Sequence, residues 1–146
     1  MSKLRLERVF PADAKTVFAF VTRPENLAKW WGPEGVSLPS YKLDFTKPGA
    51  WSSEMLNADG KRFKVTGKVV AVDAPKSVEL TWAWHDEDGV RGHESRVRFE
   101  ITPQGAKGAK FTLVHSGLRD EESQRTHNMG WTSSLKKLER LAAQPG

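Results

Sequence analysis

The chain has 146 residues, of which 38% are hydrophobic and 28% are charged, and its 23 Lys and Arg against 18 Asp and Glu give a formal net charge of +5. This composition argues against a disordered chain and a membrane-spanning protein, and the length predicts a single domain over residues 1–146. Because the sequence contains no cysteine, disulfides, thiolate nucleophiles and cysteine-ligated zinc are excluded. The unusual feature is six Trp residues, which indicate either a heavily aromatic core or a lined pocket.

The N-terminal residues and the distribution of charge predict neither a membrane partner nor a nucleic-acid partner. Residues 1–6 lack the apolar run of a signal peptide, so we expect a cytoplasmic protein without a membrane partner. The densest basic stretch, residues 61–68, alternates basic side chains with Phe63 and Val65. Such alternation is typical of a strand with one solvated face, and we therefore expect no nucleic-acid partner.

The N-terminal part of the sequence predicts one strand and two short helices. Apolar and polar residues alternate over residues 3–10, which indicates a first strand. Asp13 is placed to cap a helix over residues 14–21. Thr22 and Glu25 have the spacing of a capping box, which predicts the start of a second, brief helix.

The middle of the sequence predicts six further strands, each bounded by turn-forming residues. Their connections are short, so neighbouring strands are expected to be antiparallel. The predicted strands cover residues 41–45, 50–56, 62–72, 77–84, 94–101 and 110–116.

The C-terminal part, about residues 121–143, has apolar residues at helical spacing. A helix of this length is about 34 Å long, more than twice the ~15 Å radius of gyration expected for the chain, so it must lie across the sheet. The predicted fold class is therefore α+β. It comprises a curved antiparallel sheet of about seven strands, two short helices after the first strand, and a long C-terminal helix across the concave face.

Six segments, in order along nearly the whole chain, carry a resemblance to a known family. They are residues 7–12 (ERVFPA), 26–33 (NLAKWWGP), 80–84 (LTWAW), 92–95 (GHES), 113–117 (LVHSG) and 127–135 (HNMGWTSSL). With these segments the chain resembles the activator of heat-shock-protein-ninety ATPase homologue family, within the START-like or polyketide-cyclase superfamily. The resemblance implies the helix-grip fold, in which the long helix covers an apolar cavity.

The resemblance also bears on activity. It implies a bacterial, small single-domain protein of a kind whose activity is mostly unassigned. The eukaryotic co-chaperone of the family carries a separate N-terminal chaperone-binding domain, for which 146 residues leave no room. This difference argues against direct activation of an ATPase.

Strand parity, helical spacing and the resemblance together predict a ligand site between the sheet and the long helix. Mostly apolar walls with a few polar groups are typical of small-molecule sites. The expected walls are Trp31, Trp51, Met55, Phe63, Trp82, Trp84, Phe111, Met129, Trp131 and Leu135, and the expected polar contacts are Arg8, His93, Glu94, His115 and His127. We expect neither a metal nor a cofactor, because no two histidines have the spacing of a zinc motif.

Three functions stay open at this point. The first is binding of a small hydrophobic or aromatic molecule in the cavity. The second is an interaction protein related to chaperone cofactors, and the third is a cyclase- or hydrolase-type enzyme in which His115 or His127 acts as general base. A homodimer is also open, and so is the question of whether the Trp side chains enclose a cavity or fill it.

Overall fold

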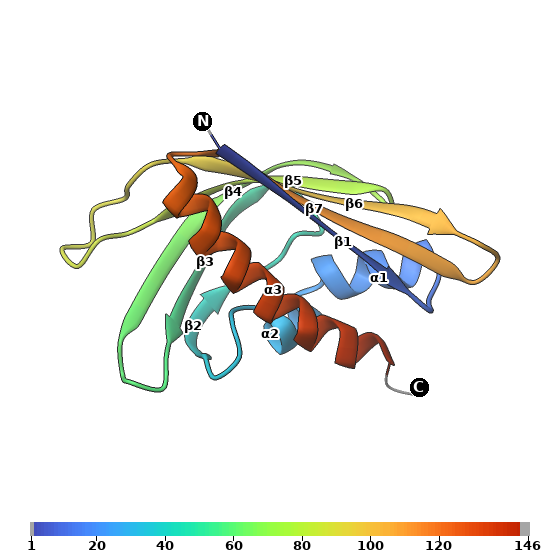
Figure 1. The fold of residues 1–146 in the computed structure, drawn as a ribbon, viewed down its shortest axis with the longest axis horizontal. Helices are drawn as coiled ribbons and strands as arrows, with labels where there is room; N and C mark the ends of the chain where they lie inside the picture. The colour runs from blue at the N-terminus through green and yellow to red at the C-terminus, as the bar shows by residue number, and fades with distance from the viewer. Residues whose placement is uncertain (1, 144–146) are drawn as a thin grey trace.

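A single antiparallel sheet with three helices on one side forms the fold of the computed structural model, which describes residues 2–143 (Figure 1). The predicted α+β class, the seven strands and the placement of the helices are confirmed. The elements are β1 (Ser2–Phe10), α1 (Ala14–Thr22), α2 (Pro24–Trp30), β2 (Ser37–Lys42), β3 (Gly49–Leu56), β4 (Arg62–Asp73), β5 (Ser77–Trp84), β6 (Ser95–Gln104), β7 (Gly108–Leu118) and α3 (Glu121–Ala143).

The strand order in the sheet is β1-β7-β6-β5-β4-β3-β2. Strands β2 to β7 are neighbours in sequence and in space, whereas β1 pairs with β7 at the opposite edge from β2. The chain crosses between these two edges through α1 and α2. Figure 1 shows α3 running diagonally over the same face, with its C-terminal half beside α2 and its N-terminal half over the other end of the sheet.

The two predicted helix caps have different outcomes. Asp13 caps α1, because its Oδ1 accepts a hydrogen bond from the Thr16 backbone N–H at 2.8 Å, as predicted. The capping box at Thr22 is wrong. Helix α1 continues through Thr22, whose hydroxyl donates to the Phe18 carbonyl at 2.6 Å, so Arg23 precedes α2 without a side-chain cap.

The first strand after the helices is shifted from its prediction. Strand β2 covers Ser37–Lys42 rather than residues 41–45. Leu43 and Phe45 lie beyond the strand and are fully buried, and the Phe45 N–H donates to the Thr22 carbonyl. Their alternation therefore reflects burial beside α1 and not strand pairing.

The inner face of the sheet carries alternate, buried side chains of the strands. In β3, Trp51, Ser53 and Met55 are buried, and the alternate residues are partly exposed. On α3, the residues that turn toward the sheet at helical spacing, Trp131, Leu135 and Leu138, are buried as well. Within residues 2–143, no helix is long and apolar enough to cross a membrane.

Candidate functional site

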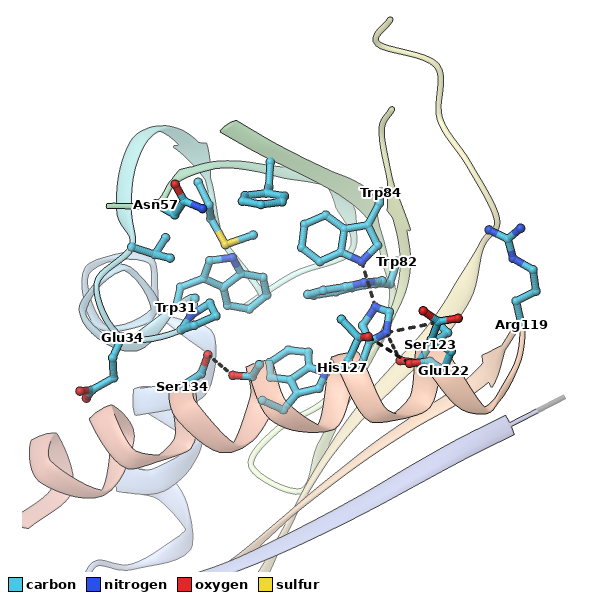
Figure 2. Close-up of a pocket in the computed structure, with 18 of the residues that line it drawn as sticks. Trp31, Glu34, Asn57, Trp82, Trp84, Arg119, Glu122, Ser123, His127 and Ser134 are labelled. Atoms are coloured by element: carbon cyan, nitrogen blue, oxygen red, sulfur yellow. Dashed lines mark hydrogen bonds between the residues drawn. The ribbon is translucent and has the colours of Figure 1, made fainter. Parts of the chain in front are cut away.

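A cavity of about 830 Å³ lies between the inner face of the sheet and the N-terminal half of α3 (Figure 2). Four segments form it: the loop after α2, the β3–β4 hairpin, the end of β5, and the first turns of α3. Its apolar lining comes from Trp31, Pro33, Val36, Met55, Phe63, Trp82, Trp84 and Trp131, and its polar lining includes Asn57, Arg119, Asp120, Glu122, Ser123, Thr126, His127 and Ser134.

The floor of the cavity is a group of aromatic rings in direct contact. Trp82 lies 5.1 Å from Trp131 and 5.7 Å from Trp31, measured between ring centroids. Trp84 stands edge-on to Trp82 at 5.6 Å, and Phe63 packs against Trp84 at 6.4 Å. These rings present broad apolar surfaces with positions fixed by mutual contact.

The cavity stays open because α3 carries small side chains where it faces these rings. Gly130 has no side chain, and a Cβ added there would meet only the Pro33 Cγ, at 3.9 Å. One turn further on, Ser134 turns its hydroxyl back to donate to the Gly130 carbonyl. Beyond Ser134, Leu135 and Leu138 are fully buried and the space is filled.

The loop after α2 closes one side of the cavity and is fastened to α3. The Glu34 N–H donates to the Ser133 hydroxyl at 2.8 Å, and the Glu34 carboxylate pairs with Arg140. Lys137 donates to the carbonyl oxygens of Trp31 and Pro33, and burial lowers the pKa of its ammonium group. Three residues of α3 thus hold the loop in place.

His127 lies on the cavity wall with both ring nitrogens engaged. Its Nδ1 donates to the Ser123 carbonyl at 2.7 Å, so its Nε2 is an acceptor and takes the indole N–H of Trp84 at 2.9 Å. Burial lowers the pKa of His127, whereas the bond to Ser123 raises it. The imidazole is therefore neutral at neutral pH.

His115 lies one layer deeper, behind the rings of Trp82 and Trp131. Its Nδ1 accepts the Trp131 indole N–H at 3.1 Å, so Nε2 carries the proton and donates to the Ser95 hydroxyl at 2.7 Å. Burial, followed by the nearby ring of His127, lowers the pKa of His115 to about 3. Because an indole N–H occupies the acceptor nitrogen of each histidine, neither is free to take a proton from a bound molecule.

The structure divides the expected site residues into those that line the cavity and those that do not. Seven of them line it: Trp31, Met55, Phe63, Trp82, Trp84, His127 and Trp131. Four others are buried and do not reach the cavity surface: Trp51, Phe111, His115 and Leu135. One of them, Phe111, packs against Phe10 and Phe99 at the other end of the core.

Four expected site residues lie away from the cavity. Arg8 forms an ion pair with Glu139 at 2.8 Å, and Glu94 pairs with Arg91 at 2.9 Å. His93 is exposed and contacts the Gly117 carbonyl at 2.7 Å. Met129 is 75% exposed, because it lies on the opposite side of α3 from Trp131 and does not line the cavity.

The sequence matches the family described as activator of Hsp90 ATPase homolog 1-like protein over residues 11–143. The chain belongs to this family. The structure of the AHSA1 protein from Silicibacter pomeroyi is 46% identical, with a TM-score of 0.93 and coverage of 97% of this chain and 98% of that one.

More distant structures share the fold alone. A Chromobacterium violaceum protein is 23% identical with a TM-score of 0.84, covering 99% of this chain and 100% of that one. A Mycobacterium smegmatis protein is 22% identical with a TM-score of 0.80, covering 99% and 92%. No curated protein matches the chain.

Several lining residues of this family member were not expected from its sequence. Ser123 and Thr126 precede His127 by four residues and one residue on α3, and Asp120 begins the helix by accepting from the Ser123 N–H. Ser123 could have been predicted, because it lies four residues before His127 and therefore on the same side of the helix. No sequence pattern indicated that the loop residues around Glu34 line the cavity. The described residues bring no three His, Asp or Glu side chains together as metal ligands.

Proposed function

We propose that this chain binds a small hydrophobic or aromatic molecule in the cavity between the sheet and α3. The observation that carries the proposal is a cavity of about 830 Å³ walled by Trp31, Trp82, Trp84 and Trp131. This volume lies within the roughly 300–1,000 Å³ of typical ligand pockets. We also propose that residues 1–146 form a single domain and that the protein is cytoplasmic. Residues 1 and 144–146 lie outside the residues that the structure describes.

The character of the wall supports an uncharged, largely apolar ligand. Indole and phenyl faces release ordered water when a ligand covers them, which favours binding in proportion to the apolar area buried. The histidine on the wall, His127, is neutral and its nitrogens are engaged. The charged side chains of the lining are Glu34, Arg119, Asp120 and Glu122, and Figure 2 shows Glu34 and Arg119 pointing away from the aromatic rings.

The two other functions have less support. A general base needs an acceptor nitrogen facing the substrate, and those of His115 and His127 are occupied. An interaction protein needs a continuous apolar surface. The exposed large apolar side chains of the described residues lie instead on separate segments: Val9, Tyr41, Val70, Val90 and Met129.

A homodimer stays a prediction, which light scattering of the purified chain would test.

The proposal is tested with the neutral fluorescent probe N-phenyl-1-naphthylamine. We expect saturable binding to the wild-type chain, with energy transfer from Trp to the probe. Gly130→Phe places a ring in the cavity, because only Pro33 approaches a Cβ at this position, and it should reduce affinity by at least about tenfold.

The matched control is Met129→Phe, which adds the same ring one residue earlier on the exposed side of α3. It should leave probe affinity unchanged, and circular dichroism should show both variants folded. Absence of saturable binding to the wild-type chain, or equal binding by Gly130→Phe, would contradict the proposed function.

A further inference from the structure

One indole of the cavity lacks a hydrogen-bond partner. The Nε1–H of Trp82, on the cavity floor, is the single buried side-chain nitrogen or oxygen without a partner among residues 2–143. The other five indoles of the chain are all bonded: Trp30 to the Phe20 carbonyl, Trp31 to Ser53, Trp51 to the Thr81 carbonyl, Trp84 to His127 and Trp131 to His115. Because buried polar groups are nearly always bonded, the exception points to a partner that the chain does not supply.

Two histidines lie beside Trp82, and the acceptor nitrogen of each is already used. The rings of His115, His127 and Trp84 stand at 5.4–6.3 Å from the Trp82 ring, measured between centroids. The free lone pair of His127 accepts from Trp84, and that of His115 accepts from Trp131. Neither histidine can therefore accept from Trp82 unless another indole loses its partner.

We infer that the ligand of this cavity supplies the missing partner. It is a neutral, mainly aromatic molecule with one hydrogen-bond acceptor, such as a ketone oxygen or a ring nitrogen, that accepts from Trp82 Nε1. This inference rests on the proposed function. It adds that the site distinguishes an acceptor-bearing ligand from a hydrocarbon of the same shape, because only the former pairs the buried donor.

The charges around the cavity favour a neutral acceptor over a carboxylate. A buried anion needs a cation beside it, and both nearby histidines are neutral. Among the lining residues, Arg119 stands with the carboxylates of Asp120 and Glu122, while Glu34 is paired with Arg140. The lining therefore has no excess positive charge for an anion. A carbonyl oxygen or ring nitrogen requires no counter-ion.

Because Trp82 Nε1 is shielded from water, the preference for an acceptor-bearing ligand over a hydrocarbon should be stronger. A donor that is already dehydrated loses no water when a ligand acceptor arrives. Figure 2 shows Trp82 beside the hydrogen bond between Trp84 and His127. Because Nε1 is closed off from solvent, its pairing with a ligand acceptor requires a local shift of the partly exposed Trp84 ring against its hydrogen bond to His127.

The test compares 9-fluorenone with fluorene, two planar tricyclic molecules that differ in one carbonyl oxygen. Each competes with N-phenyl-1-naphthylamine for the wild-type chain. We expect fluorenone to bind about tenfold more tightly, as one added hydrogen bond implies. Trp82→Phe should abolish this preference. The control Trp51→Phe should keep it, because Trp51 is equally buried but its N–H is bonded to the Thr81 carbonyl outside the cavity.

A second measurement uses the wild-type chain alone, so that it does not depend on the folding of a variant. In ¹H–¹⁵N spectra of the six indoles, fluorenone should move the Trp82 Nε1–H resonance downfield, and fluorene should not. Equal binding of both compounds would overturn the inference and leave the proposed function standing. A preference that persists in Trp82→Phe would also overturn it, and binding of neither compound would contradict both.

Discussion

The two ends of the layer between the sheet and α3 differ in how they are occupied. At the packed end, beside α1, the ring of Phe111 packs against those of Phe10 and Phe99, and all three side chains are buried. At the cavity end, α3 presents Gly130 and Ser134, and about 830 Å³ stays empty. The same sheet and the same helix therefore produce a solid core or a cavity, depending on side-chain volume along α3.

The ends also differ in what fixes their side chains. Rings at the packed end are held by close packing alone, as in most protein interiors. At the cavity end, hydrogen bonds to His127 and His115 fix the indoles of Trp84 and Trp131. Two indoles of the cavity end are therefore held by directional bonds as well as by packing.

The largest expected effect compares one substitution at the two ends. Phe111→Ala should lower the free energy of unfolding by about 3–5 kcal/mol, because Phe111 is fully buried in the packed end. Phe63→Ala should cost about 1–2 kcal/mol, since Phe63 is half-buried and faces the cavity. Urea denaturation measures both, and equal losses would contradict the comparison.

Acidification should weaken the cavity end. The unfolded chain binds a proton at His115 near the ordinary pKa of 6.5, whereas in the folded chain that pKa is about 3. Stability is therefore lost as the pH falls below 6.5, by about 2 kcal/mol between about pH 7 and pH 5. Urea denaturation across this range measures the loss. His115→Gln should flatten the dependence, and an unchanged slope in this variant would disprove the assignment.

Replacing glycine by alanine should have opposite signs at the two ends. Gly130→Ala should raise the free energy of unfolding by about 0.5–1 kcal/mol, because alanine favours a helix and the added Cβ has space. Gly108→Ala should lower it, since its Cβ would approach the Gln104 carbonyl oxygen to 2.7 Å and that of Phe10 to 3.2 Å. Thermal unfolding measures both, and a loss of stability in Gly130→Ala would show that the cavity end has no spare volume.

The smallest expected effect concerns Arg8, which was expected at the site. Its ion pair with Glu139 is partly exposed, so Arg8→Ala should cost no more than about 1 kcal/mol. Affinity for N-phenyl-1-naphthylamine should not change, because Arg8 does not line the cavity. Weaker probe binding in this variant would extend the site toward β1.

Alternation and periodicity were sufficient to predict six of the seven strands and α3, whereas β2 lies earlier in the chain than predicted. Side chains with period two face one side of a strand whatever their neighbours are, so Trp51, Met55 and Trp82 could be assigned to the inner face. The N-terminal part was less predictable. Thr22 can cap a following helix or bond within its own, and only the packing of α1 decides between these.

Depth behind the cavity wall was not predictable from parity. His115 and Trp82 both face inward and their rings are in contact, but only Trp82 reaches the cavity surface. Two rows of side chains on different strands overlap in space, and the sequence carries no information on which lies in front. For Met129 a signal existed, because its position two residues after His127 places it on the other side of a helix.

The contact between indoles has a spectroscopic consequence. Trp31 touches the rings of Trp30, Trp51, Trp82 and Trp131, all at centroid distances of 5.7–6.0 Å. At such separations the electronic transitions of neighbouring indoles couple, so the protein absorbs circularly polarised light as a multi-ring chromophore and not as independent residues. A molecule that enters beside Trp82 changes this coupling, which gives the chain a built-in optical reporter of its own cavity.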